Sequence, residues 1–191
     1  MHLITTDNII MPIKSICVFC GARSGVKPEY AHAATELGQE IARHGWRLVY
    51  GAGDMGIMGS VATATKTNGA PTFGVIPEHL LGYETNKPEQ GNNIVTDDMH
   101  SRKKLMFVNS DAVVVLPGGA GSLDEFFEVL TWAQLGLHQR PIILGNIAGY
   151  WDPLIALIDH VVDQGFADPS LRTLFHVCDT VQGAVEILRS S

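Results

Sequence analysis

The sequence predicts a single-domain α/β fold, with a doubly wound, mostly parallel sheet covered by helices on both faces. Two observations predict this architecture. Short apolar runs rich in Val, Ile and Leu alternate with helix-like segments along the chain. The apolar runs lack the alternation of polar and apolar residues that is typical of a strand with one solvated face, so both faces of the sheet are expected to be buried.

The expected elements follow one another in a regular order. Strands are expected at 15–20, 46–51, 71–77, 93–97, 111–119, 141–146 and 174–179. Helices are expected at 28–45, near 57–68, at 99–110 and 122–137, near 151–165, and in a last segment ending near 189. Pro28 marks the start of the first helix and Gly45 its end. A polar loop is expected at 80–93, residues 1–13 are expected to be an N-terminal extension, and no repeat or interdomain linker interrupts the single domain 1–191.

Composition excludes several classes of function. The formal net charge of −7 argues against a general nucleic-acid binder, because such proteins need a basic face. No apolar run is long enough for a membrane helix, and the first residues do not resemble a signal peptide, so the expected location is the cytoplasm. Cys17 and Cys20 lie on opposite faces of one expected strand, which favours buried thiols over a metal site. We expect no metal and no membrane partner.

The first glycine-rich turn follows the expected strand 46–51. Gly51, Gly53 and Gly56 match the GxGxxG pattern that binds dinucleotides where a strand leads into a helix. The match is incomplete, because the turn follows the second strand and the acidic Glu78 comes directly after a proline. Contact with some ligand is expected here, and the alternative is that the glycines only allow a tight turn and close helix packing.

The second glycine-rich turn, PGGAGSLDE (117–125), is the most specific feature of the sequence. Gly118, Gly119 and Gly121 leave backbone N–H groups uncovered next to a helix start, which predicts an anion site. The Ser122 hydroxyl is expected to donate to a phosphate oxygen. The alternative is a capping box, with Ser122 as the N-cap and Glu125 at the third helical position. No Lys-Ser or Lys-Thr follows the glycines, so the turn is not a P-loop.

A basic segment, MHSRKK (99–104), begins the helix at 99–110. Met99 and Arg102 share one helical face. The start of a helix disfavours cations, so we expect Arg102 and Lys103 to face a bound anion there. Lys104 is expected to be solvated, and His100 to be a cap or a surface residue.

These segments resemble the Lonely Guy family, long labelled "lysine decarboxylase-like". The resemblance extends from about residue 15 to 188 and rests on the family signature PGGxGTxxE with an upstream MHxRK. The matching segments are CGARSG (20–25), GAGDMGIMG (51–59), MHSRK (99–103), PGGAGSLDE (117–125), TWAQLG (131–136) and GYWDPL (149–154).

The resemblance implies a modified Rossmann fold and hydrolysis of the N-glycosidic bond of nucleoside 5'-monophosphates, notably N6-modified adenosine monophosphates, without a cofactor. It implies a homodimer with the site near the interface. Arg102 and Glu125 would be the catalytic pair. The substrate-binding residues that it implies are Ser24, Gly53, Met99, Lys103, Gly118, Gly119, Gly121 and Ser122.

The sequence departs from the family pattern at a few positions. Ser122 replaces the usual Thr and keeps the hydroxyl, whereas Ala52, Ala22 and Arg23 change the surroundings of the first glycine turn. The decarboxylase label has no support, since no lysine is marked for a pyridoxal phosphate Schiff base. Two other functions stay open: a nucleotide or molybdenum-cofactor carrier, and a nicotinamide-dependent oxidoreductase. The sequence does not indicate which base is preferred.

Overall fold

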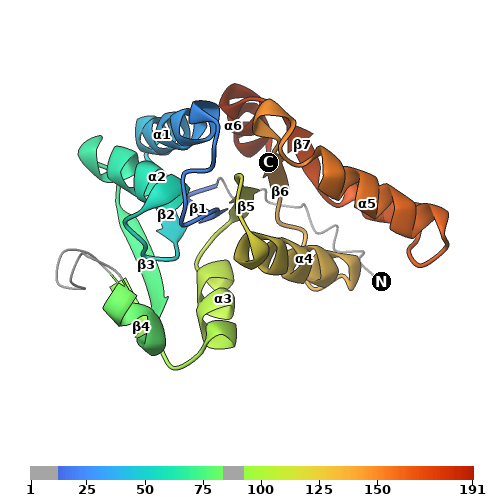
Figure 1. Ribbon diagram of the computed structural model, residues 1–191, viewed down its shortest axis with the longest axis horizontal. Helices are drawn as coiled ribbons and strands as arrows, with labels where there is room; N and C mark the ends of the chain where they lie inside the picture. Colours follow the sequence, from blue (N-terminus) through green and yellow to red (C-terminus); the bar gives the residue numbers. More distant parts are fainter. Residues whose placement is uncertain (1–12, 84–92) are drawn as a thin grey trace, which may run out of the picture.

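The computed structural model describes residues 13–83 and 93–191, and these residues build one parallel sheet with helices on both faces (Figure 1). Its seven strands lie in the order β4-β3-β2-β1-β5-β6-β7, and all six pairings between them are parallel. This is the doubly wound arrangement of a modified Rossmann fold, so the predicted fold class is confirmed.

The elements agree with the predicted order, with ends that differ by a few residues. The strands are β1 (Ser15–Phe19), β2 (Arg47–Tyr50), β3 (Thr72–Pro77), β4 (Asn93–Thr96), β5 (Ala112–Val115), β6 (Ile142–Gly145) and β7 (His176–Cys178). The α-helices are α1 (Pro28–Arg43), α2 (Gly56–Thr67), α3 (Met99–Val108), α4 (Ala120–Gln134), α5 (Asp152–Asp163) and α6 (Val181–Ser190). Within the described residues, short 3₁₀ helices are η1 (Glu78–Tyr83), η3 (Ile147–Gly149) and η4 (Pro169–Thr173).

The structure corrects two predicted boundaries, the start of the polar loop and the start of α4. The start of the polar loop predicted at 80–93 is helical, because η1 extends to Tyr83, and residues 84–92 lie outside the described residues. Residues 1–12 of the expected N-terminal extension also lie outside them. Helix α4 begins at Ala120, two residues before the predicted start at Ser122.

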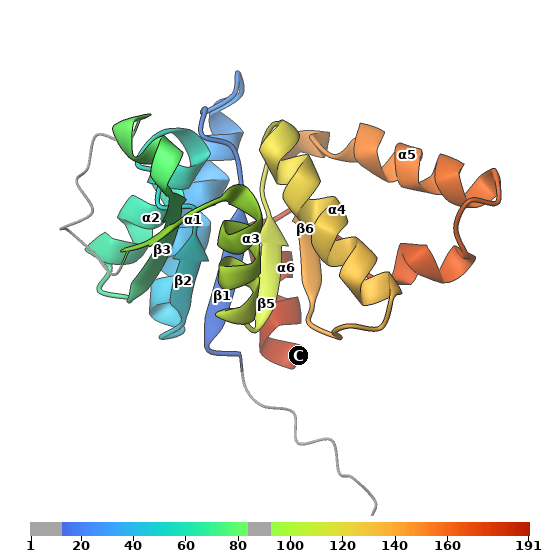
Figure 2. The same cartoon turned by 90° about the horizontal axis from the view of Figure 1, so that it is seen from below.

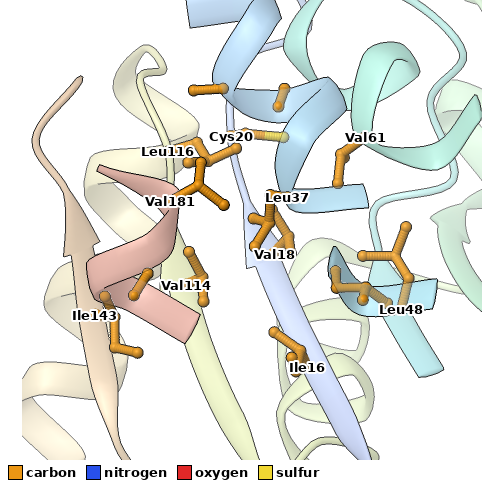
Figure 3. Packing of buried hydrophobic residues seen from close by; sticks show 14 of the residues in the cluster. Ile16, Val18, Cys20, Leu37, Leu48, Val61, Val114, Leu116, Ile143 and Val181 are labelled. Carbon is orange, nitrogen blue, oxygen red and sulfur yellow. The ribbon is translucent and has the colours of Figure 1, made fainter. Parts of the chain in front are cut away.

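The sheet separates two hydrophobic cores. Helices α1, α2 and α6 cover one face, and α3, α4 and α5 cover the other (Figures 1 and 2). Figure 3 shows the first core, in which Val18 and Leu37 meet between β1 and α1. Cys20 belongs to this core and Cys17 to the opposite one, and all three cysteines are free and buried. The predicted opposite orientation of the two thiols is confirmed.

The chain reverses its winding between β1 and β5, which are hydrogen-bonded neighbours in the centre of the sheet. After β1 the chain passes to α1 on one face, and after β5 it passes to α4 on the other. The two connections therefore diverge at the carboxyl ends of these strands. Ligands of open α/β sheets bind in the crevice that forms at such a point.

Candidate active site

A cavity of about 480 Å³ lies at the carboxyl ends of β1 and β5, where the connections diverge. Its volume is in the range of small-molecule sites. It is lined by the first glycine turn, the second glycine turn, α3 and the loop after β1. The described residues that line it are Cys20, Gly21, Ala22, Arg23, Ser24, Gly25, Tyr30, Gly51, Ile57, Met58, Leu80, Arg102, Pro117, Gly118, Gly119, Gly121, Ser122, Glu125 and Tyr150.

The start of α4 opens into this cavity. Gly119 is the N-cap, and the first helical hydrogen bond runs from the Leu123 N–H to the Gly119 carbonyl at 3.1 Å. The N–H groups of the first turn, up to Ser122, therefore have no partner inside the helix. A Cβ at Gly119 or Gly121 would meet nothing within 4 Å, so there is open space beside this turn. The helix dipole adds partial positive charge, which makes this turn suited to an anion.

Ser122 lies inside the first turn of α4 and is not its N-cap, so the capping-box alternative is wrong. Its Oγ is buried and has no hydrogen-bond partner among the described residues. A Cβ on Gly118 would lie 2.0 Å from that Oγ, so glycine is required there to make room for the hydroxyl. An unsatisfied hydroxyl in a cavity wall is costly without a ligand, so the Ser122 hydroxyl is a donor available to one.

Glu125 follows Ser122 by one helical turn and lies on the same face. It is only 7% exposed, and burial raises the pKa of its carboxyl to about 7, although the positive charge of Arg102 opposes the rise. Glu125 Oε1 lies 3.9 Å from Arg102 Nη1. The structure thus brings together the two residues that the family resemblance implied as a catalytic pair. Their separation exceeds a direct hydrogen bond.

Backbone carbonyls hold the Arg102 guanidinium in place. Its Nε donates to the Val75 carbonyl at 3.0 Å, and its Nη2 donates to the Gly51 carbonyl at 3.3 Å. A Cβ on Gly51 would lie 1.9 Å from Nη2, so the first glycine of the GxGxxG pattern provides the space for the arginine. Nη1 remains directed to Glu125 and to the Met99 sulfur, 3.8 Å away.

The other glycines of the first turn serve packing. Gly56 has a φ of +61° and lies against the backbone of Ala22, 2.5 Å from where its Cβ would be. The Gly53 N–H donates to the Met58 sulfur at 3.2 Å, and Gly53 is not among the residues that line the cavity. Ala52 adopts a φ of 62°, a conformation that favours glycine. These contacts fit the packing alternative for the turn better than a dinucleotide site.

Lys103 binds two carboxylates of α4. Its Nζ lies 2.8 Å from Asp124 Oδ2 and 3.3 Å from Glu128 Oε2, both on α4, and it does not line the cavity. Burial lowers the pKa of Lys103, but the two carboxylate bonds outweigh this effect, so its pKa lies above the usual value. The side chain therefore joins α3 to α4 beside the Arg102–Glu125 pair.

Most of the residues singled out in the sequence meet at the cavity. Its lining includes Ser24, Gly118, Gly119, Gly121, Ser122, Arg102 and Glu125, whereas Gly53, Met99 and Lys103 are absent from it. Sequence reasoning gave no role to Tyr150, whose hydroxyl donates to the Gly118 carbonyl at 2.6 Å, or to Tyr30, which packs edge-on against it. The segment GYWDPL (149–154) was part of the family resemblance and was the available signal for Tyr150.

Other chemistry is not supported at this site. Burial, reinforced by the negative charge of Glu125, raises the pKa of Cys20 far above its ordinary value, so this thiol is a poor nucleophile. Among residues 13–83 and 93–191, no group of three or more His, Cys, Asp or Glu side chains is arranged to hold a metal ion. Within the same residues, no helix has the length and apolar character required to span a bilayer.

Comparison with known proteins shows the family to which this chain belongs. A family model described as "Possible lysine decarboxylase" matches residues 58–188. A cytokinin riboside 5'-monophosphate phosphoribohydrolase of Rhodococcoides fascians is 43% identical over 182 residues, which are 93% of this chain and 90% of that protein. The chain belongs to the Lonely Guy family. A cytokinin riboside 5'-monophosphate phosphoribohydrolase of Arabidopsis thaliana shares 45% identity over 161 residues, 84% of this chain and 74% of the relative.

Solved structures show that the Lonely Guy chain shares its fold with carrier proteins. A molybdenum cofactor carrier protein from Chlamydomonas reinhardtii superposes with a TM-score of 0.70 at 25% identity, covering 93% of this chain and 96% of the carrier. A molybdenum cofactor binding protein from Rippkaea orientalis gives a TM-score of 0.67 at 24% identity, with 93% and 96% covered. The second likeness shows the fold alone.

Proposed function

We propose that this chain hydrolyses the N-glycosidic bond of nucleoside 5'-monophosphates and releases the free base and ribose 5-phosphate. One observation carries the proposal. The buried carboxyl of Glu125 lies one turn into α4, beside Arg102, in the cavity where the helix start is open. The relatives named above as phosphoribohydrolases support the same reaction.

The start of α4 is the proposed phosphate site. Backbone N–H groups at Gly119 and Gly121, with the Ser122 hydroxyl, offer several donors and the positive end of a helix dipole. From Ser122 to Glu125 the helix rises by about 4.5 Å, roughly the span of a ribose ring. A phosphate bound at the helix start therefore places the sugar beside the Glu125 carboxyl, and binding energy at the phosphate orients the reacting bond.

Glu125 and Arg102 divide the charge that develops in the reaction. Glycosidic cleavage gives the ribose oxocarbenium character, which a carboxylate beside C1' stabilises. Glu125 also orients the water that adds to C1' and accepts a proton from it. The C1'–N bond breaks with its electron pair leaving on the base, and the proton ends on the base. Arg102 stabilises the negative charge that the leaving base develops.

The base is proposed to be adenine or N6-modified adenine. Named relatives act on cytokinin riboside 5'-monophosphates. The apolar side chains of Ile57, Met58 and Leu80 line the same cavity, and they provide an environment for an apolar base.

A direct assay tests the proposed reaction. The purified chain is incubated with adenosine monophosphate and, separately, with isopentenyladenosine monophosphate, and free base is followed by chromatography. We expect base and ribose 5-phosphate in equal amounts, and at least a hundredfold slower release by Glu125→Gln, because the developing positive charge loses its carboxylate. The lysine substitution Lys104→Gln, at an exposed position outside the cavity, is the control. Near-normal turnover by Glu125→Gln contradicts the mechanism.

A carrier function is the second candidate, and the 25% identical molybdenum cofactor carrier favours it. Binding of adenosine monophosphate without base release would support the carrier. A decarboxylase is not supported, because none of the described residues that line the cavity is a lysine, whereas pyridoxal phosphate chemistry requires one. The buried Lys103 is engaged by Asp124 and Glu128.

We also propose a homodimer and a cytoplasmic location. Large apolar side chains are exposed on and after α4, namely Phe127, Leu135 and Leu137 at 38%, 68% and 70%. Apolar surface of this kind is typical of an interface between subunits. The free, buried cysteines fit a reducing compartment.

A further inference from the structure

The proposed site must bind a phosphate that carries about two negative charges, in a chain with a net charge of −7. Among the described residues that line the cavity, Arg23 and Arg102 are the two with a permanent positive charge. Which of them balances the phosphate follows from the partners that each already has.

Arg102 is committed to the protein. Its Nε and Nη2 donate to the carbonyls of Val75 and Gly51, and Nη1 lies 3.9 Å from Glu125. A Cβ on Gly51 would lie 1.9 Å from Nη2, so the guanidinium is packed directly against the glycine. Arg102 is therefore held beside the carboxylate and is not free to swing to the start of α4.

The guanidinium of Arg23 is not bound to another of the described residues. The residue is exposed, and no hydrogen bond or ion pair joins its guanidinium to another of the described residues. An unpaired arginine on a cavity wall has all of its donors available to an anion, and it binds phosphate in a bidentate manner.

The backbone that carries Arg23 is fixed against the second glycine turn. The Gly21 N–H donates to the Pro117 carbonyl at 3.0 Å, and the Met58 N–H donates to the Gly21 carbonyl at 3.1 Å. A Cβ on Gly21 would lie 3.2 Å from the Gly118 Cα, so the two turns are in contact. Only Ala22 separates Gly21 from Arg23, so their Cα atoms are at most about 7 Å apart, a distance that an arginine side chain spans.

The anion site does not rest on the helix start alone. Ser122 is only 2% exposed and lies in the same cavity wall. Its buried hydroxyl has no hydrogen-bond partner among the described residues. Helix α4, with Ser122, and the segment that carries Arg23 thus line one cavity from two separate parts of the chain.

We infer that Arg23 is the cation that neutralises the 5'-phosphate of the substrate at the start of α4, while Arg102 acts at the ribose and the base. The inference rests on the proposed function for the identity of the substrate. It divides between two arginines a task that the sequence assigned to Arg102 and Lys103.

Binding measurements test this role apart from catalysis. In a Glu125→Gln background, which is expected to slow turnover at least a hundredfold, calorimetry compares the binding of adenosine monophosphate, ribose 5-phosphate and adenosine. Arg23→Gln is expected to lower the affinity for both phosphorylated ligands by about 10- to 100-fold, which corresponds to the loss of a charge-assisted hydrogen bond. The affinity for adenosine is expected to stay unchanged. Arg23→Lys is expected to recover part of the loss. Lys104→Gln removes one charge outside the cavity and is expected to match the parent.

Kinetics provide a second readout. With Glu125 intact, Arg23→Gln is expected to raise KM for adenosine monophosphate at least tenfold and to change kcat less than threefold. The inference is overturned if Arg23→Gln changes the affinity for the phosphorylated ligands by less than twofold. It is also overturned if the affinity for adenosine falls by the same factor as the affinity for adenosine monophosphate. If the parent chain releases no base but its binding of adenosine monophosphate depends on Arg23, the proposed reaction fails and this inference stands. If the parent chain releases base and Arg23→Gln does so at the same rate at low substrate, the proposed reaction stands and this inference fails.

Discussion

Glu125 is buried beside Arg102, and these two features act on its carboxyl in opposite directions. Burial favours the neutral acid, and the guanidinium 3.9 Å away favours the carboxylate. Burial prevails, and the pKa rises from 4.5 to about 7. A catalytic acid or base works best when its pKa lies near the working pH, so this balance suits a group that must take up and release protons.

The raised pKa predicts a stability cost at alkaline pH. Folded Glu125 binds its proton more tightly than the unfolded chain does, so its favourable contribution is complete below pH 4.5 and is lost as the pH rises through about 7. At pH 8, Glu125→Gln is expected to unfold with a free energy about 3 kcal/mol higher than the parent. At pH 4.5 the two should agree closely. Urea titrations at both pH values measure the difference, and an equal gap at both would contradict the assignment.

At the scale of elements, α3 and α4 face each other with two adjacent sets of opposite charges. Arg102 opposes Glu125, and the next residue, Lys103, binds Asp124 and Glu128. The lysine neutralises two carboxylates that otherwise raise the pKa of Glu125, and its own charge lowers that pKa. The ion pairs thus influence both the position of α4 against α3 and the pKa of the Glu125 carboxyl.

Removing the Lys103 charge is expected to shift the pH dependence of activity. If ionised Glu125 is the active form, kcat rises with pH through about 7 in the parent chain. In Lys103→Met, Asp124 and Glu128 lose their counter-ion, so the pKa of Glu125 rises and the activity limb moves to higher pH. A pH series of kcat measures the shift.

Two controls separate this electrostatic effect from damage to the fold. Lys104→Met removes the same charge at an exposed position of α3 and is expected to leave the limb in place. Lys103→Arg keeps the charge and should restore the parent profile. A Lys103→Met enzyme that is slower at every pH, with an unmoved limb, would show a purely structural role.

At the scale of the whole molecule, the order of the strands decides where the site lies. The β1 and β5 strands are far apart in the sequence, yet they pair in register from Ile16 with Ala112 to Phe19 with Val115. Their connections leave the same edge of the sheet in opposite directions, and both glycine turns end beside one cavity. Figure 2 shows this edge, with the loop after β1 and the start of α4 at the top of the molecule.

The exposed apolar residues near the end of α4 predict a dimer. Leu135 and Leu137, at 68% and 70% exposure, are expected to be buried against a second copy. Light scattering of the parent should give twice the mass of the chain, and Leu135→Asp with Leu137→Asp should give the mass of one chain, because burial of the new charges is unfavourable. A dimer that survives both substitutions would place the interface elsewhere.

The sequence by itself determined the features that depend on neighbouring residues. The spacing of apolar residues predicted the strands and helices, Pro28 and Gly45 marked the ends of α1, and the glycines before Glu125 marked a wall of the cavity. The family resemblance pointed to Arg102 and Glu125 together, and the structure places them 3.9 Å apart. Such patterns are readable because backbone conformation and helical faces are set locally.

The tertiary structure alone decided which partners those residues have. It turned Lys103 toward Asp124 and Glu128, and it matched Gly51 to the guanidinium of Arg102. It also placed Arg23 on the cavity wall, without a bonded partner for its guanidinium among the described residues. Each of these contacts, or its absence, depends on segments that are separated in the sequence. Burial and charge pairing are properties of the folded packing, so the order of residues along the chain cannot specify them locally.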